Sequence, residues 1–139
     1  MNQAALKPSE LIVNDDGRIY HLHLRPENLA DIVLLVGDPG RVERISHCFD
    51  EIEFKIRNRE FITHTGYYKN KRISVISTGI GTDNMDIVMN ELDAVANIDL
   101  KNRTFNQKRK SLDIIRIGTS GSLQEDIDVG DFLVSEFGL

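Results

Sequence analysis

Two arginines lie beside turns whose residue types could bind an anion, and a third arginine lies between predicted strands. Arg41 directly follows the turn "GDPG", Arg116 stands two residues before "GTSGS", and Arg59 lies in "RNREF". A guanidinium group can hold a phosphate through two parallel hydrogen bonds. Glycine has no Cβ, so the backbone N–H groups of a glycine-rich turn can approach an anion closely. Together these residues favour a phosphate site.

The turns follow three segments that have the apolar pattern of strands. Their sequences are "VGDPGR", "ISTGIGTDN" and "RIGTSGS". Hydroxyl donors in the second and third are Thr78, Thr119, Ser120 and Ser122. Ligands of α/β sheets bind beyond the carboxyl ends of the strands, so we expect the turns to meet there. No turn is specific alone, because none has the P-loop spacing and no G-x-G-x-x-G follows a strand.

Arg116 has two interpretations. It interrupts an apolar strand, and burying an unpaired charge is costly, so the side chain must find a partner or reach the strand's end. The partner could be Asp113 or Glu125, which would make Arg116 a structural residue. The residue by itself favours neither interpretation. The coincidence of three arginines and three strand-end turns favours the anion site.

Apolar periodicity predicts the elements that position these turns. Strands are expected over 19–24, 31–37, 53–78 (several, with a turn at Lys69-Asn70), 112–118 and 131–137. Helices are expected over 40–49 and from a cap at Thr82 or Asp83 to about residue 98. Continuous apolar runs at 31–37 and 112–118 indicate buried strands. The alternation predicts a three-layer α/β/α fold with a mixed, partly parallel central sheet.

Length and composition exclude several classes of protein. The 139 residues suffice for one domain, which we place at 19–139 after a loosely held lead-in at 1–18. A net charge of −5 argues against a nucleic-acid binder, and the basic stretch 99–111 fits a solvated loop better than a nucleic-acid patch. Cys48 has no cysteine partner, which favours the reducing cytoplasm. No signal peptide or membrane-spanning run is evident.

Several motifs, taken in order, resemble one family. "VGDPGRVERI", "NREF", "STGIGT" and "IIRIGTSGSLQEDIDVGD" resemble segments of the nucleoside phosphorylases, the family of uridine phosphorylase and the hexameric type of purine nucleoside phosphorylase. "IYHLHL" resembles the family's N-terminal segment, so the match begins at about Ile19. The resemblance implies an α/β fold with a mixed sheet. It also implies phosphorolysis, in which nucleoside and phosphate give free base and ribose 1-phosphate.

The resemblance implies roles for particular residues. Phosphate would be held by the Gly37 amide, Arg41, Arg116 and Thr119, of which Arg116 and Thr119 would be catalytic and Thr119 would also contact the nucleoside. Arg59 would complete the phosphate site from a neighbouring subunit, and His21 would cross to the ribose 5′-hydroxyl, so a homodimer or hexamer is expected. Glu60 matches a monovalent-cation position, potassium for example, although Asn84 replaces the small hydroxyl residue expected there. No other metal and no organic cofactor is required.

Without the resemblance, these residues have ordinary explanations. His21 would be a satisfied strand histidine, Arg59 would form a surface ion pair beside Glu60, and Thr119 would satisfy its own turn. Neither His47 nor His64 is assigned a role, and the same holds for Cys48.

Family members have chains roughly twice this long. We therefore expect this chain to supply the phosphate half of the site, on a truncated sheet with an exposed edge. Uridine is the favoured substrate and a purine nucleoside the alternative. A hydrolytic nucleosidase has no need of three phosphate-facing arginines, and a catalytically inactive fragment that binds anions or a partner chain is the non-enzymatic alternative.

Overall fold

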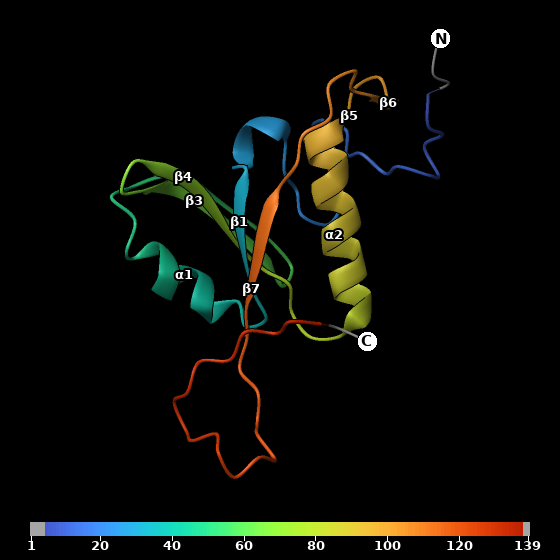
Figure 1. Ribbon diagram of the computed structural model, residues 1–139. Helices are drawn as coiled ribbons and strands as arrows, with labels where there is room; N and C mark the ends of the chain where they lie inside the picture. The colour runs from blue at the N-terminus through green and yellow to red at the C-terminus, as the bar shows by residue number, and fades with distance from the viewer. Residues whose placement is uncertain (1–4, 138–139) are drawn as a thin grey trace.

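The computed structural model describes residues 5–137, which form a five-stranded mixed sheet between two helices (Figure 1). In chain order the elements are η1 (Pro26–Asn28), β1 (Ile32–Val36), α1 (Gly40–Ser46), β2 (Glu51–Asn58), β3 (Phe61–Tyr68), β4 (Lys71–Ser77), α2 (Thr82–Asn97), β5 (Ile98–Asp99), β6 (Thr104–Phe105) and β7 (Asp113–Ile117). The strands of the main sheet lie in the order β2-β3-β4-β1-β7, and β5 and β6 form a separate pair.

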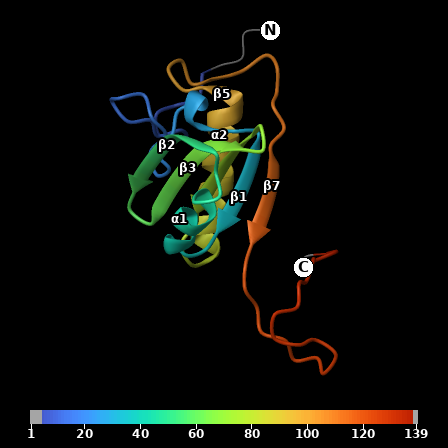
Figure 2. The same ribbon diagram turned by 90° about the vertical axis from the view of Figure 1, so that its left-hand side faces the viewer.

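The two helices cover opposite faces of the sheet (Figures 1 and 2). Alternate residues of β1 point to opposite faces, as the two-residue period of a strand requires. Val33 packs in one hydrophobic cluster with Leu92 of α2, whereas Val36 packs in another with Val42 of α1. The predicted three-layer α/β/α architecture is therefore confirmed.

Strands β2, β3 and β4 form an antiparallel meander, and β1 pairs in parallel with both β4 and β7. The turn between β3 and β4 has φ of 48° at Lys69 and 64° at Asn70. Positive φ at both central residues is the type I′ geometry that matches the twist of hairpin strands. The predicted turn at these residues is confirmed.

The strand predicted over 19–24 is wrong. Leu22 and Leu24 are buried, but Tyr20, at the next position of the alternating pattern, is exposed. The backbone instead closes into a loop, in which the Ile19 amide donates to the Leu24 carbonyl at 3.0 Å and the His23 amide donates to the Ile19 carbonyl at 3.1 Å. His23 has a φ of 56°, which ends any extended path.

Two predictions near the C-terminal side are also corrected. Residues 131–137 form no strand, and their apolar side chains are exposed. The strand predicted over 112–118 exists as β7, but it lies at the edge of the sheet, and Ile115 and Ile117 are exposed. Among residues 5–137 no strand pairs with the outer side of β7, so the predicted exposed edge is confirmed.

Smaller differences concern the helix ends and the lead-in. Helix α2 begins at Thr82, but its N-cap is Gly81 with φ 103°, and no side chain caps it, so the predicted cap at Thr82 or Asp83 is wrong. Helix α1 ends at Ser46, before the predicted residue 49.

The described part of the lead-in is not loose, because Leu11 is buried in the core and the Leu6 amide donates to the Arg103 carbonyl at 2.8 Å. Neither helix within residues 5–137 is long and apolar enough to cross a membrane.

Candidate functional site

The three glycine-rich turns lie together at the carboxyl ends of their strands, as their positions after those strands predict. Strands β4, β1 and β7 are parallel neighbours, and Val36 lies in register with both Ser77 and Ile117. The residues that follow these three positions therefore start side by side. Since helix α1 leaves on one face and α2 on the other, this is a point where the chain's connections diverge, a usual place for a ligand in an α/β sheet.

A cavity of about 660 Å³, which we call the strand-end cavity, opens at the carboxyl ends of these strands. Its lining residues are Gly37, Asp38, Pro39, Arg41, Glu60, Thr78, Gly79, Ile80, Gly81, Asn84, Met85, Arg116, Gly118 and Thr119. All four residues predicted to hold phosphate from within one chain line it. The cavity also has an apolar part at Ile80 and Met85, which the sequence analysis did not single out, although Ile80 lies within a quoted turn and Met85 directly follows it.

Arg41 and Thr119 meet across the cavity. Arg41 Nη2 lies 3.4 Å from Thr119 Oγ1, a weak hydrogen bond between residues 78 positions apart. Arg41 stands in the first turn of α1, and Thr119 follows β7. The fold therefore brings together two polar groups that the sequence places in separate motifs.

Arg116 approaches the same cavity from the other side of the sheet. It lies in register with Leu35, which packs toward α2, so its side chain starts from the α2 face. A Cβ placed on Gly118 would lie 2.5 Å from Arg116 Nη1, so the guanidinium folds closely over that glycine. Within residues 5–137 Arg116 forms no ion pair with Asp113 or Glu125. The interpretation of Arg116 as a structural residue paired with one of these carboxylates is therefore not supported by the described residues.

Two carboxylates also line the cavity, and each has a hydrogen-bond donor of its own. Asp38 Oδ1 accepts from the Gly40 amide at 2.9 Å, which fixes the turn before α1. Glu60 Oε1 accepts from Asn84 Nδ2 at 3.2 Å. Arginine has five N–H donors, and a single contact to Thr119 leaves most of those on Arg41 free for an anion.

Gly79 holds the second turn in a shape that other residues would strain. Its φ is +70°, and an added Cβ would lie 2.6 Å from Asn84 Nδ2 and 3.0 Å from Glu60 Cγ. Thr78 beside it is buried, with its hydroxyl donating to the Gly79 carbonyl at 3.0 Å. The predicted hydroxyls of Ser120 and Ser122 do not line the cavity.

Glu60, which matches a monovalent-cation position, is hydrogen-bonded within its own chain, and its cation role stays a prediction. The amide nitrogen of Asn84 faces the Glu60 carboxylate. Residues 5–137 contain no group of three or more His, Cys, Asp or Glu side chains arranged to hold a metal ion.

His21 and Arg59 lie outside the cavity, although they lie near each other. The Arg59 guanidinium carbon stands 5.8 Å from the centre of the Tyr20 ring, and the Tyr20 and His21 rings contact edge to face with centroids 4.7 Å apart. Arg59 lies in the turn between β2 and β3 and has a left-handed backbone conformation, with a φ of 53°. Both residues were predicted to act on a neighbouring subunit, and their roles stay predictions.

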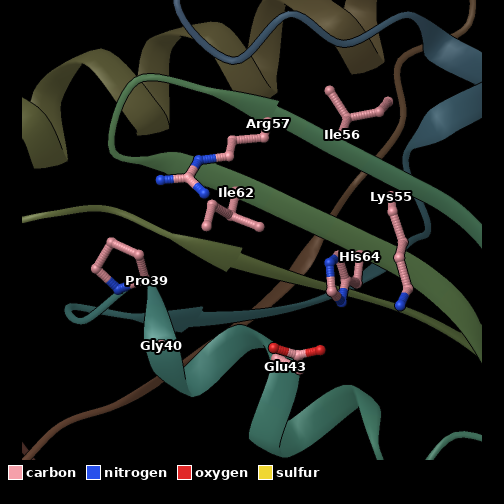
Figure 3. A pocket seen from close by; sticks show the side chains of 8 residues that line it. All are labelled: Pro39, Gly40, Glu43, Lys55, Ile56, Arg57, Ile62 and His64. Carbon is pink, nitrogen blue, oxygen red and sulfur yellow. The ribbon is translucent and has the colours of Figure 1, made fainter.

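A second cavity, of about 470 Å³, lies between α1 and the strands β2 and β3 (Figure 3). Figure 3 shows Glu43 of α1 pointing toward the strands that carry Lys55 and His64. His64 is 8% exposed, and its Nδ1 lies 2.7 Å from Ser46 Oγ. Burial, together with the nearby Lys55 ammonium group, lowers the pKa of His64 below its usual range. Basic and acidic groups oppose each other here, and the histidine already has a partner, so the strand-end cavity is the better candidate.

The fold and the strand-end cavity define an α/β protein with a candidate ligand site at the carboxyl ends of its parallel strands. Comparison with protein families gives the class a name. The model of the Phosphorylase superfamily matches residues 31–136, and the chain belongs to this family. The resemblance seen in the motifs is thereby confirmed.

Two curated relatives have different names. The chain is 38% identical to a uridine phosphorylase of Thermococcus kodakarensis over 122 residues, which cover 88% of this chain and 39% of the relative. It is 36% identical to a DeoD-type purine nucleoside phosphorylase of Exiguobacterium over 116 residues, covering 83% of this chain and 44% of the relative. The chain thus spans about 40% of the length of the relatives that it matches.

A solved structure supports the same assignment. The nucleoside phosphorylase of Trypanosoma brucei, whose structure is described as showing uridine phosphorylase activity, superimposes with a TM-score of 0.77 and 36% sequence identity. The match covers 85% of this chain and 41% of that structure. The described fold is therefore a part of the nucleoside phosphorylase fold.

Proposed function

We propose that this chain supplies the phosphate-binding part of a nucleoside phosphorylase. The observation that carries the proposal is the strand-end cavity, where Gly37 and Arg41 of one motif converge with Arg116 and Thr119 of another. Two guanidinium groups, a backbone amide and a hydroxyl form a suitable donor set for one phosphate dianion. A phosphorylase uses inorganic phosphate as its second substrate.

In the proposed reaction, a phosphate oxygen bonds to C1′ of the ribose as the C1′–N bond breaks. The bonding electron pair leaves with the base, which takes up the proton that the phosphate loses, so the products are free base and ribose 1-phosphate. Positive charge develops on the ribose ring in the transition state. Arg41 and Arg116 would hold the phosphate below that ring, so catalysis is mainly positioning with electrostatic stabilisation by the bound dianion. Thr119 would bind phosphate and contact the nucleoside.

Uridine is the proposed substrate, because uridine phosphorylases stand among both the curated and the structural relatives. Purine nucleosides are the second candidate, favoured by DeoD-type relatives of nearly equal identity. A third candidate, an inactive fragment that binds anions or a partner chain, is favoured by the exposed β7 edge and by the share of the relatives that is covered.

The proposal includes a homo-oligomer, either a dimer or a hexamer. His21 and Arg59 lie outside the cavity of their own chain, which supports their donation to the site of a neighbouring copy. His21 would contact the ribose 5′-hydroxyl, and Arg59 would contact phosphate. Potassium at Glu60 stays a prediction from the resemblance and has no part in this mechanism.

We also propose a cytoplasmic location. An exposed free thiol at Cys48 is suited to a reducing compartment.

The test is an assay of this chain with uridine and with inosine, each with and without phosphate. Release of uracil and ribose 1-phosphate that depends on phosphate would support the uridine phosphorylase. Faster release of hypoxanthine would support the purine enzyme. Base release without phosphate would contradict the proposal in favour of a nucleosidase. Phosphate binding without turnover of either nucleoside would support the inactive fragment.

A further inference from the structure

Glu91 is a carboxylate on the apolar side of α2, where a charge is unexpected. It lies next to Leu92 and three residues after Val88, both fully buried. Its side chain is only 12% exposed. A carboxylate removed from water is costly unless hydrogen bonds satisfy it, so its partners explain why it stands there.

Within residues 5–137, the side-chain carboxylate of Glu91 accepts hydrogen bonds only from the loop that contains His21. The His21 amide lies 3.0 Å from both carboxylate oxygens, and the Leu22 amide donates to Oε2 at 2.8 Å. His21 Nδ1 lies 2.7 Å from Oε1. One side chain thus binds the backbone and the ring of a residue 70 positions away in the sequence.

These contacts determine which ring nitrogen of His21 carries a proton. An ionised carboxylate only accepts hydrogen bonds, so Nδ1 must be the donor at 2.7 Å. In the neutral ring Nε2 is then left with a lone pair and can accept a hydrogen bond. A hydroxyl group is a suitable donor for it.

Neighbouring groups hold the same loop from the other side. Asn58 Nδ2 donates to the His21 carbonyl at 2.8 Å and to the Tyr20 carbonyl at 3.3 Å. The Phe61 ring faces the His21 ring edge to face, with centroids 6.3 Å apart. The His21 ring is therefore positioned before any ligand or second copy arrives.

We propose that Glu91 is a positioning residue for His21: it orients the imidazole and keeps the proton on Nδ1, so that Nε2 accepts a hydrogen bond from a sugar hydroxyl. The inference rests on the proposed function, in which His21 contacts the ribose 5′-hydroxyl of a nucleoside. A residue with a merely structural role would affect stability without fixing the tautomer of His21.

The first test is ¹⁵N NMR of the histidine rings in this chain, which distinguishes the two neutral tautomers and needs no activity. The unmodified protein should show His21 with the proton on Nδ1. In Glu91→Gln the carboxamide presents N–H groups to this loop, so the population with the proton on Nε2 should rise. Asp86→Asn is the control. The Asp86 carboxylate lies on the same helix, is exposed and accepts a hydrogen bond from Asn90, so its replacement should leave the His21 tautomer unchanged. An unmodified chain with the His21 proton on Nε2 would overturn the proposal, whether or not the variant folds.

The second test compares uridine with 5′-deoxyuridine in the phosphorolysis assay. Loss of one well-placed hydrogen bond corresponds to a change of about 10-fold. Glu91→Gln should raise KM for uridine by about that factor and leave KM for 5′-deoxyuridine and kcat nearly unchanged. Equal effects on both substrates would overturn the positioning role. An absence of turnover in the unmodified chain would instead count against the proposed function, and the NMR result would still decide the role of Glu91.

Discussion

Strands β1 and β7 have similar apolar sequences, yet they lie in very different surroundings. The residues of β1 read "IVLLV", and Val33, Leu35 and Val36 are buried. The residues of β7 read "DIIRI", and Ile115 is 55% exposed. The first strand has neighbours on both sides and helices on both faces, whereas β7 pairs with β1 alone within residues 5–137. An apolar run therefore predicts a strand, but its burial depends on what packs around it.

The difference extends beyond β7. Residues 118–137 run away from the sheet without a helix or strand (Figures 1 and 2). Leu123, Val129 and Phe132 are fully exposed there. Large exposed apolar groups are typical of surfaces that associate with other protein. We call residues 5–117 the closed region and residues 118–137 the open region. The cavity lies on the boundary between them, because the closed region supplies Arg41 and the open region supplies Thr119.

The largest effect that tests this contrast should come from Leu92→Ala. Leu92 is fully buried between α2 and the sheet. Its truncation removes apolar contacts and leaves a cavity, so the free energy of unfolding should fall by about 2–5 kcal/mol. Urea denaturation followed by circular dichroism measures the change.

The matched control is Leu123→Ala in the open region. Leu123 is fully exposed, so its truncation should change the free energy of unfolding by less than about 0.5 kcal/mol. Equal losses for the two variants would show that residues 118–137 pack on the body in solution. The contrast between the closed and open regions would then be wrong.

A smaller effect is expected from alanine at Gly79, a glycine that lines the cavity. Gly79→Ala would place a Cβ 2.6 Å from Asn84 Nδ2 at a φ of +70°, so we expect a loss of about 1–3 kcal/mol in unfolding free energy. Gly121→Ala, in the open region, would meet no atom within 4 Å and should be nearly neutral. Thermal unfolding of both variants checks this. A neutral Gly79→Ala would mean that the second turn is not held in the described shape.

Much of this fold follows from local sequence patterns. The apolar runs that became β1 and β7, the turn at Lys69-Asn70 and the face of α2 all depend on residues close in the chain. The loop 19–24 did not follow, because its alternation matches a strand while Glu91, far along the chain, binds its amides. Such a contact leaves no local signal other than a charge on an apolar helix face.

The candidate site was also predictable in part. The strand-end turns indicated Arg41, Arg116 and several hydroxyl groups as candidates, because parallel strands bring such turns together, and the family resemblance selected Gly37 and Thr119. Their actual meeting depends on the register of β4, β1 and β7, which no single motif contains. The hydrogen bond from Asn84 to Glu60 depends on a side-chain orientation, so it could not be predicted from residue types.

The most direct measurement of the central claim is calorimetric titration of inorganic phosphate into this chain and two variants. Removal of a charge-assisted hydrogen bond costs about 1.5–3 kcal/mol, so Arg116→Ala should weaken phosphate binding by about 10- to 100-fold. Arg44→Ala is the control, since Arg44 is an exposed arginine of α1 that does not line the cavity, and it should bind phosphate as the unmodified chain does. If Arg116→Ala binds phosphate as tightly as the unmodified chain, the cavity at the ends of β4, β1 and β7 is not a phosphate site.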